Sequence, residues 1–182
     1  MRQLSKKMDK ILELFIENPE KEFHVRELAR ALKLSPTTVS NKLKKYTKDN
    51  ILFLDRKLNH LFFKANSENP RYKLLKLQGN LLAIENSGLI NYLEEQFHPH
   101  AIGLFGSFAK AENIPSSDID LFIISSSKKE LNLEKFEKYL KHKIQLFIFS
   151  NENIQKMKDK NKELLNNMAN GIIIRGYFEL FK

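Results

Sequence analysis

The segment from Gly106 to Asp120 constrains the fold more than any other part of this sequence. It directly follows an apolar run at 100–105, and Asp118 and Asp120 open a second apolar run. Short apolar runs are typical of buried β-strands, and in a strand residues i and i+2 point to the same face. We therefore predict a strand at 100–105, a turn that opens a helix, and a strand at 118–125 that carries both carboxylates on one face.

The two ends of this segment have the chemistry of a site for a metal-bound phosphate. Gly106 and Ser107 open a helical turn, where unpaired backbone N–H groups attract an anion and a glycine lets a phosphate approach the backbone. Asp118 and Asp120 offer two oxygen ligands, and Mg²⁺ typically binds one or two carboxylates together with substrate phosphates. The sequence therefore predicts a Mg²⁺ site beside a phosphate-binding turn.

Helices and strands also alternate in the remainder of the C-terminal part. The expected elements are a helix at 133–141, a strand at 143–149, one or two helices at 154–168 and a short strand at 171–174. Two Leu- and Ile-rich helices are expected before them, between 71 and 97, divided at Asn86-Ser87-Gly88. Apolar residues on several faces of the first of these helices indicate either a connector with a dimer contact or a helix inside one core.

Positive charge is concentrated at the N-terminal end of the chain. The formal net charge is +9, and residues 1–66 hold 15 Lys and Arg against 8 Asp and Glu, whereas residues 67–182 hold 16 against 14. A basic region attracts polyanions, because neutralised phosphates release their condensed counterions. Nucleic-acid binding is therefore expected in the first 66 residues.

Three helices are expected in this basic region. Apolar residues at helical spacing predict helices at 3–17 and at about 25–32. A third helix is expected at 36–48, because Ser35 is a suitable N-cap and proline is favoured at the first helical position. The exposed face of this third helix is polar and basic.

Two short β-prone runs follow, at 51–54 and 61–63, and predict a hairpin. This order of elements resembles the winged helix-turn-helix of many bacterial and archaeal regulators, over about the first 65 residues. The resemblance implies that the third helix enters the major groove of double-stranded DNA and that the hairpin contacts the backbone. The residues expected at the DNA are Thr37, Thr38, Asn41, Lys44, Lys45, Lys48, Arg56 and Lys57. The alternative is a solvated Lys-rich helix on a protein-interaction module.

The C-terminal motif resembles the signature of the minimal nucleotidyltransferases, in the superfamily that includes DNA polymerase beta. The residues that carry the resemblance are Gly106, Ser107, Ala109, Lys110, Glu112 and Ser117-Asp118-Ile119-Asp120-Leu121. Residues 171–177 are similar to the closing strand of the same family, and the resemblance covers about residues 99–182. It implies a small mixed sheet flanked by helices, and transfer of a nucleoside monophosphate from a nucleoside triphosphate with release of pyrophosphate.

The resemblance also assigns roles to individual residues. Asp118 and Asp120 are the implied catalytic residues and the implied ligands of Mg²⁺ or Mn²⁺. The implied contacts of the nucleotide are Gly106, Ser107, Lys110 and Ser117. Lys110 stands where the family often has Arg, and it is equally well interpreted as a surface lysine.

One position departs from the family pattern. The family usually has a third carboxylate on the strand after the intervening helix, whereas the matching position here is Gln145. An amide oxygen is uncharged and a poor proton acceptor, and no acidic residue lies between Leu140 and Asn151. Three outcomes remain open: slow catalysis, catalysis with a group borrowed from an acceptor protein, or nucleotide binding without turnover.

These observations predict an α+β chain with a winged helix-turn-helix at 1–66, a helical connector at 67–98 and a nucleotidyltransferase-like domain at 99–182. Its expected ligands are double-stranded DNA, a nucleoside triphosphate and Mg²⁺ or Mn²⁺. The expected acceptor is a protein or a nucleic acid, and family analogy points to a HEPN-type toxin and to an antitoxin-like role. The apolar faces of the first helix after residue 71 indicate a homodimer. The alternative is a transcriptional regulator whose second domain senses nucleotide or dimerises. A cytoplasmic protein without membrane contact is expected, and the lack of cysteine excludes disulfides.

Overall fold

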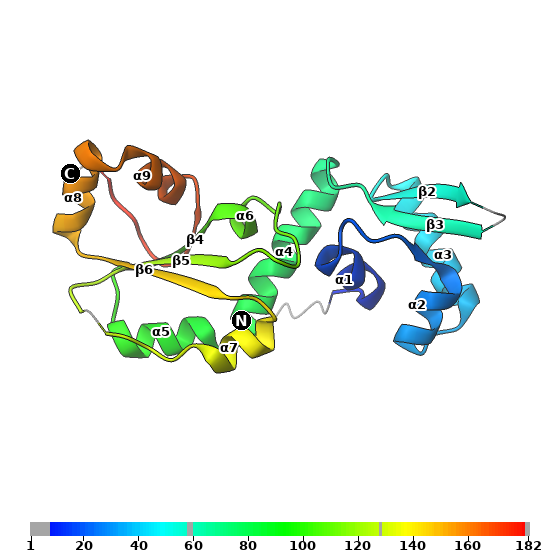
Figure 1. The fold of residues 1–182 in the computed structure, drawn as a ribbon, viewed down its shortest axis with the longest axis horizontal. Coiled ribbons are helices and arrows are strands. Elements are labelled where there is room, and N and C mark those ends of the chain that lie inside the picture. Colours follow the sequence, from blue (N-terminus) through cyan, green and yellow to red (C-terminus); the bar gives the residue numbers. More distant parts are fainter. Residues whose placement is uncertain (1–7, 58–59, 128, 181–182) are drawn as a thin grey trace, which may run out of the picture. The chain divides into compact units, whose positions relative to one another are not determined.

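The computed structural model describes residues 8–57, 60–127 and 129–180 (Figure 1). The chain divides into two compact units, Met1–Gly79 and Asn80–Lys182. The boundary lies inside α4 (Pro70–Asn86), a helix that begins in the first unit and ends in the second. Each unit has a hydrophobic core of its own.

The helices of the first unit before α4 are α1 (Lys10–Glu17), α2 (Val25–Leu32) and α3 (Pro36–Lys48). The expected second and third helices are confirmed, and Ser35 caps α3 by accepting a backbone hydrogen bond of 3.1 Å. The expected helix at 3–17 starts later than predicted, because Asp9 accepts a backbone hydrogen bond and acts as the N-cap of α1. Residues 3–7 of that expected helix lie outside the described residues.

A three-stranded antiparallel sheet completes the first unit. Its strands are β1 (Phe23–His24), β2 (Leu52–Lys57) and β3 (His60–Ala65), in the order β1-β3-β2. β2 and β3 form the predicted hairpin, but Asp55, Arg56 and Lys57 continue the ladder where a loop was expected. β1 escapes prediction, because a pattern of two residues is too short to recognise.

The core of the first unit joins all three helices to the start of α4. Phe15 of α1, Leu28 of α2 and Val39 of α3 are buried. Tyr72 of α4 is fully buried as well, and its hydroxyl donates a hydrogen bond of 3.0 Å to the carbonyl oxygen of Phe15. A buried tyrosine hydroxyl with a partner avoids the cost of an unsatisfied polar group. The beginning of α4 is therefore part of this core.

The second unit is built on a four-stranded mixed sheet. Its strands are β4 (Ala101–Phe105), β5 (Ile119–Ile124), β6 (Ile144–Phe149) and β7 (Ile172–Gly176), in the order β6-β5-β4-β7. β4 pairs antiparallel with β5 and β7, whereas β5 and β6 are parallel and are connected through α7 (Glu134–Leu140). All the strands predicted for this part of the chain are present within one or two residues of their expected ends.

Helices cover both faces of this sheet (Figure 1). They are α5 (Leu89–Phe97) and α7 on one face, and α8 (Asn151–Lys160) and α9 (Lys162–Ala169) on the other. Leu121 packs toward α5 and α7, and its neighbour Phe122 packs toward α8 and α9, so β5 is buried on both faces. Within the described part of the chain, no helix has the length and apolar character needed to cross a membrane.

Candidate functional site

The turn after β4 lies directly against a carboxylate of β5. Gly106 is the first residue of α6 (Gly106–Ala109), a single turn of helix, and its φ of 68° is in the left-handed region that favours glycine. Asp120 is paired with Phe105, the residue before the turn. A Cβ atom at Gly106 would lie 2.1 Å from Oδ2 of Asp120. Both the backbone angle and the lack of space therefore require glycine here.

Asp118 and Asp120 are a pair of like charges at the start of β5. Only Asp120 belongs to the strand, because β5 begins at Ile119; the prediction that the strand carries both carboxylates was wrong by one residue. Burial raises the pKa of Asp120, and the negative charge of Asp118 raises it further. A divalent cation turns this repulsion into attraction. The pair is therefore a fitting donor set for Mg²⁺ or Mn²⁺.

The remaining residues expected at the nucleotide belong to the same turn and to the loop after it. Ser107 is half-buried in α6, and Lys110 is exposed at the C-terminal end of that helix. Ser117 directly precedes the acidic pair, and its Oγ accepts a hydrogen bond of 2.9 Å from the N–H of Ile114. The structure thus brings Gly106 to the acidic pair and gives Ser117 a contact that shapes the loop.

Gln145 lies beside the acidic pair on the neighbouring strand. The parallel register of β5 and β6 places Gln145 opposite Asp120, and its Nε2 donates a hydrogen bond of 2.7 Å to Oδ2 of Asp118. An amide nitrogen bearing hydrogens is a donor and does not ligate a cation. The amide oxygen can ligate a cation, but it brings no negative charge. Among the residues that the structure describes, no three His, Cys, Asp or Glu side chains gather as metal ligands.

His142 is a residue near the site that sequence reasoning missed. Its Nδ1 lies 2.7 Å from the carbonyl oxygen of Ser117. Its ring meets the ring of Phe108 edge-on, with the centroids 4.9 Å apart. His142 therefore contacts both the helix of the turn and the residue before the acidic pair. The available signal was its place just before the strand predicted at 143–149.

Asn80 is a second residue that sequence reasoning missed. It is buried in α4, and its Nδ2 donates two hydrogen bonds, of 3.0 Å to the carbonyl oxygen of Phe108 and of 2.8 Å to Oδ1 of Asn113. Phe108 belongs to the helix of the turn, and Asn113 belongs to the loop that leads to Asp118. Asn80 therefore ties α6 to the loop before Asp118, through contacts that no local pattern reveals.

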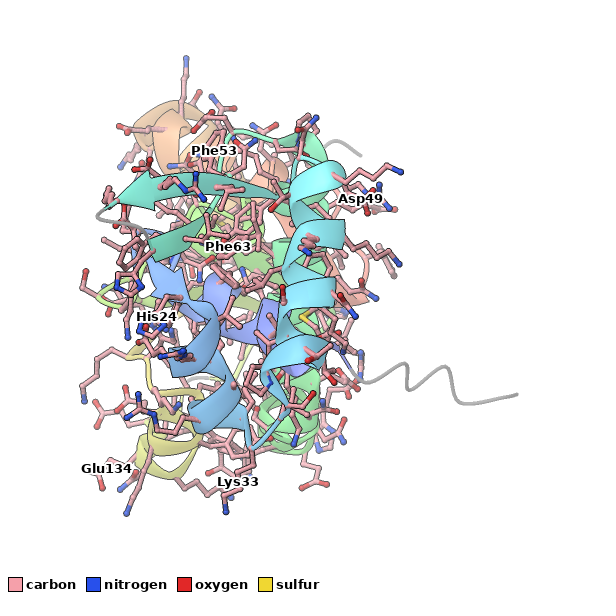
Figure 2. All side chains as sticks on the ribbon, turned by 90° about the vertical axis from the view of Figure 1, so that its right-hand side faces the viewer. His24, Lys33, Asp49, Phe53, Phe63 and Glu134 are labelled. Carbon is pink, nitrogen blue, oxygen red and sulfur yellow. The ribbon has the colours of Figure 1, made fainter. Side chains whose placement is uncertain are left out.

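Every residue expected at the DNA is exposed on the first unit. These residues are Thr37, Thr38, Asn41, Lys44, Lys45 and Lys48 on α3, and Arg56 and Lys57 on β2. Figure 2 looks onto α3, whose side chains project along its length between the labelled Lys33 and Asp49. Lys57 differs from the others, because its Nζ lies 2.6 Å from the carboxylate of Glu22 and 3.4 Å from that of Asp55. Its charge is therefore already balanced by two acids.

A pocket of about 150 Å³ lies elsewhere in the second unit. Its lining includes His100, Tyr177 and Ile124, the last residue of β5. Asp120 is the second residue of the same strand and Asp118 directly precedes the strand, so the acidic pair stands at its other end. The pocket is thus separate from the acidic pair, and the chemistry of the carboxylates and of the turn decides the position of the candidate site.

Comparison with known proteins bears on this part of the chain. No curated protein and no solved structure matches. Residues 87–176 match the family model described as polymerase beta, nucleotidyltransferase, and this range contains the turn, the acidic pair and Gln145. The mixed sheet with flanking helices fits a nucleotidyltransferase fold. The second unit therefore carries a nucleotidyltransferase domain of the polymerase beta type at residues 87–176.

Proposed function

We propose that this chain is a DNA-binding nucleotidyltransferase, which transfers a nucleoside monophosphate from a nucleoside triphosphate to a protein or nucleic-acid acceptor. The observation that carries the proposal is the close approach of Gly106 to Asp120. It sets the first backbone N–H groups of α6 beside a carboxylate that can bind a cation. A metal-bound triphosphate presents both groups together, so one ligand satisfies both sides of the site.

The residues of the site divide the work of binding. Asp118 and Asp120 hold Mg²⁺ or Mn²⁺, and the backbone at Gly106 and Ser107 holds the triphosphate. When bound, the cation supplies positive charge to the phosphate oxygens, which favours attack on phosphorus and departure of pyrophosphate. Ser117 fixes the loop before Asp118 through its hydrogen bond to Ile114. Lys110 adds a positive charge at the end of the same turn.

Transfer is tested with the full chain, Mg²⁺ or Mn²⁺, each labelled nucleoside triphosphate and candidate acceptors. We expect the wild type to label an acceptor and Asp118→Ala and Asp120→Ala to lose the labelling. Asp159→Ala is a matched control, because Asp159 is an exposed acid on α8. Equal labelling by the wild type and by both site variants would show that the acidic pair is not the catalytic site.

The first unit is proposed to be a winged helix-turn-helix that binds double-stranded DNA. The support is the excess of Lys and Arg in residues 1–66 and the exposed polar and basic face of α3. Phosphate contacts make such binding sensitive to salt, because each one releases a counterion. A protein-interaction module with a solvated α3 shows no salt-dependent affinity for DNA.

DNA binding is tested by electrophoretic shifts at several salt concentrations. We expect the affinity to fall steeply with salt, and Lys44→Ala or Lys45→Ala to reduce the slope by about one unit. Lys129→Ala, in the second unit, is the control for a general loss of charge. DNA affinity that is absent, or indifferent to salt, contradicts the proposal for the first unit.

The acceptor is proposed from the family resemblance alone. Related proteins often pair with HEPN-type toxins, so an antitoxin-like homodimer that modifies such a partner and binds its own operator is the version we propose. Labelling of a co-expressed HEPN-type protein, with unrelated proteins as controls, tests this part separately from the transfer reaction.

A second candidate function is a transcriptional regulator that binds a metal nucleotide without transferring it. The hydrogen bond from Gln145 to Asp118 favours this candidate. It shows that the side chain beside the acidic pair is a neutral amide and not a third carboxylate. If the wild type transfers nothing and Gln145→Asp gains transfer, the regulator is the better description. Transfer by the wild type excludes it.

A further inference from the structure

The side of the acidic pair that faces β6 presents hydrogen-bond donors. Nε2 of Gln145 donates to Oδ2 of Asp118 at 2.7 Å, and the strand register places Gln145 directly opposite Asp120. The same side chain therefore stands next to both acids. Residues 141–150 contain neither Asp nor Glu, so no other side chain of this segment supplies a negative charge.

The lysine before β6 brings no acceptor to this side either. Lys143 lies two residues before Gln145, and the negative charge of Asp118 contributes to raising its pKa, after the larger effect of its hydrogen bond with Glu137. Its Nζ lies 2.9 Å from Oε2 of Glu137. The backbone of this segment is fixed to the segment of the pair, because the N–H of Ile119 donates to the carbonyl oxygen of Lys143 at 2.8 Å. The ammonium group of Lys143 is thus paired with Glu137, and the group that this side presents to a cation is the amide of Gln145.

Two cations at one site need more acceptors than the pair offers. Two-metal sites for phosphoryl chemistry hold their ions about 3.5–4 Å apart, and shared carboxylates offset the repulsion between them. Within the described ranges, no third acid or histidine joins Asp118 and Asp120 as a ligand. The pair fits one divalent cation shared with a triphosphate, and it does not fit two.

We propose that this site takes a single divalent cation with its nucleotide, and that Gln145 is the residue that limits it to one. The inference rests on the proposed nucleotide site and specifies its metal content. An acid at position 145 supplies the missing negative charge and removes the hydrogen bond that Gln145 donates to Asp118. A neutral residue without donors removes only the hydrogen bond. These two kinds of substitution separate the effect of charge from the effect of the hydrogen bond.

The test counts Mn²⁺ on the full-length protein in the presence of α,β-methylene ATP and the corresponding analogues of the other nucleotides, none of which can be cleaved at the α-phosphate. Equilibrium dialysis gives the number of ions per chain, and electron paramagnetic resonance shows whether two ions are close enough to couple. We expect one uncoupled Mn²⁺ for the wild type and for Gln145→Ala, and two coupled ions for Gln145→Asp. Gln145→Glu is the second acidic variant if Gln145→Asp fails to fold.

The outcomes separate the inference from the function on which it rests. Wild-type protein that retains nucleotide with two Mn²⁺ ions overturns the inference and leaves the nucleotide site in place. Acidic variants that fold, retain nucleotide and still hold one ion overturn the role of Gln145. Wild-type protein that retains none of the tested nucleotides, with or without Mn²⁺, overturns the proposed nucleotide site itself.

Discussion

The two sides of the acidic pair differ in what they offer to a ligand. On the side of β4, the backbone at Gly106 approaches Oδ2 of Asp120 with no side chain between them. On the side of β6, Gln145 fills the corresponding position with an amide that already donates to Asp118. The comparison teaches that a backbone free of side chains and a full set of acidic ligands for cations are separate properties of a site. The side of β4 has the first property, and the side of β6 lacks an acidic ligand.

The largest effect is expected from a substitution of Gly106, on the β4 side of the acidic pair. Gly106→Ala places a Cβ atom on Oδ2 of Asp120 and adds about 1–2 kcal/mol for a left-handed backbone, so we expect a clear fall in Tm and at least a tenfold loss of nucleotide affinity. Gly88→Ala is the control, because Gly88 has a φ of 75° with nothing within 4 Å of its Cβ position. If both variants bind nucleotide equally well, the close approach at the turn has no role in binding.

Asn80 sharpens the description of the β4 side. Asn80→Ala deprives the carbonyl oxygen of Phe108 and the side chain of Asn113 of a buried donor, so we expect a loss of about 1–3 kcal/mol of unfolding free energy. Nucleotide affinity should fall with it, since the turn loses its support. Asn170→Ala, which removes one exposed hydrogen bond, is the control. Chemical denaturation measures the free energy of unfolding of both variants. A loss for Asn80→Ala as small as that for Asn170→Ala would show that the buried amide is dispensable.

His142 tests the β6 side in the same way. His142→Phe keeps a ring against Phe108 but loses the hydrogen bond to the carbonyl oxygen of Ser117, so we expect a loss of about 1 kcal/mol in stability. A weaker nucleotide affinity, by a few-fold, should accompany it, because Ser117 precedes Asp118. His60→Phe, at an exposed position at the start of β3, is the control. Unchanged affinity would confine His142 to a structural role.

The smallest effect is expected from the charge of Asp120 itself. Its pKa is raised in the folded protein above the ordinary value of 3.8, so the stability it contributes is present at lower pH and is lost as the pH rises through the folded pKa. Asp120→Asn should therefore raise Tm by a few degrees near neutral pH and by less near pH 3. Asp159→Asn should change little. A lower Tm for Asp120→Asn at neutral pH would contradict the assignment of the raised pKa to burial and to the charge of Asp118.

Local chemistry made much of the fold predictable. Ser35 and Pro36 carry the start signal of α3 in adjacent residues, and the structure begins this helix at Pro36. β4 and residues 121–124 of β5 are continuous apolar runs, because they are buried, and such runs are visible in sequence. The acidic pair and the turn were also predictable, because both belong to one short motif in the sequence.

The missed features depend on contacts between distant residues. β1 is a strand only because Phe23 and His24 pair with β3, some forty positions along the chain. The hydrogen bonds of Asn80 to Phe108 and of His142 to Ser117 also join separate elements. Single-sequence patterns report periodicity and caps, and they contain no information about which side chain meets which across the core.

The shared helix α4 affects how this protein can be divided. Tyr72 lies in the core of the first unit, and Ile84, on the same helix, lies in the core of the second. Domains usually meet at exposed linkers that can be cut or exchanged. Here any cut that releases one unit removes a buried residue from a core or interrupts the helix between them. Gene fragments encoding either half alone should therefore yield less stable products, and exchange of either part by recombination must preserve the whole helix.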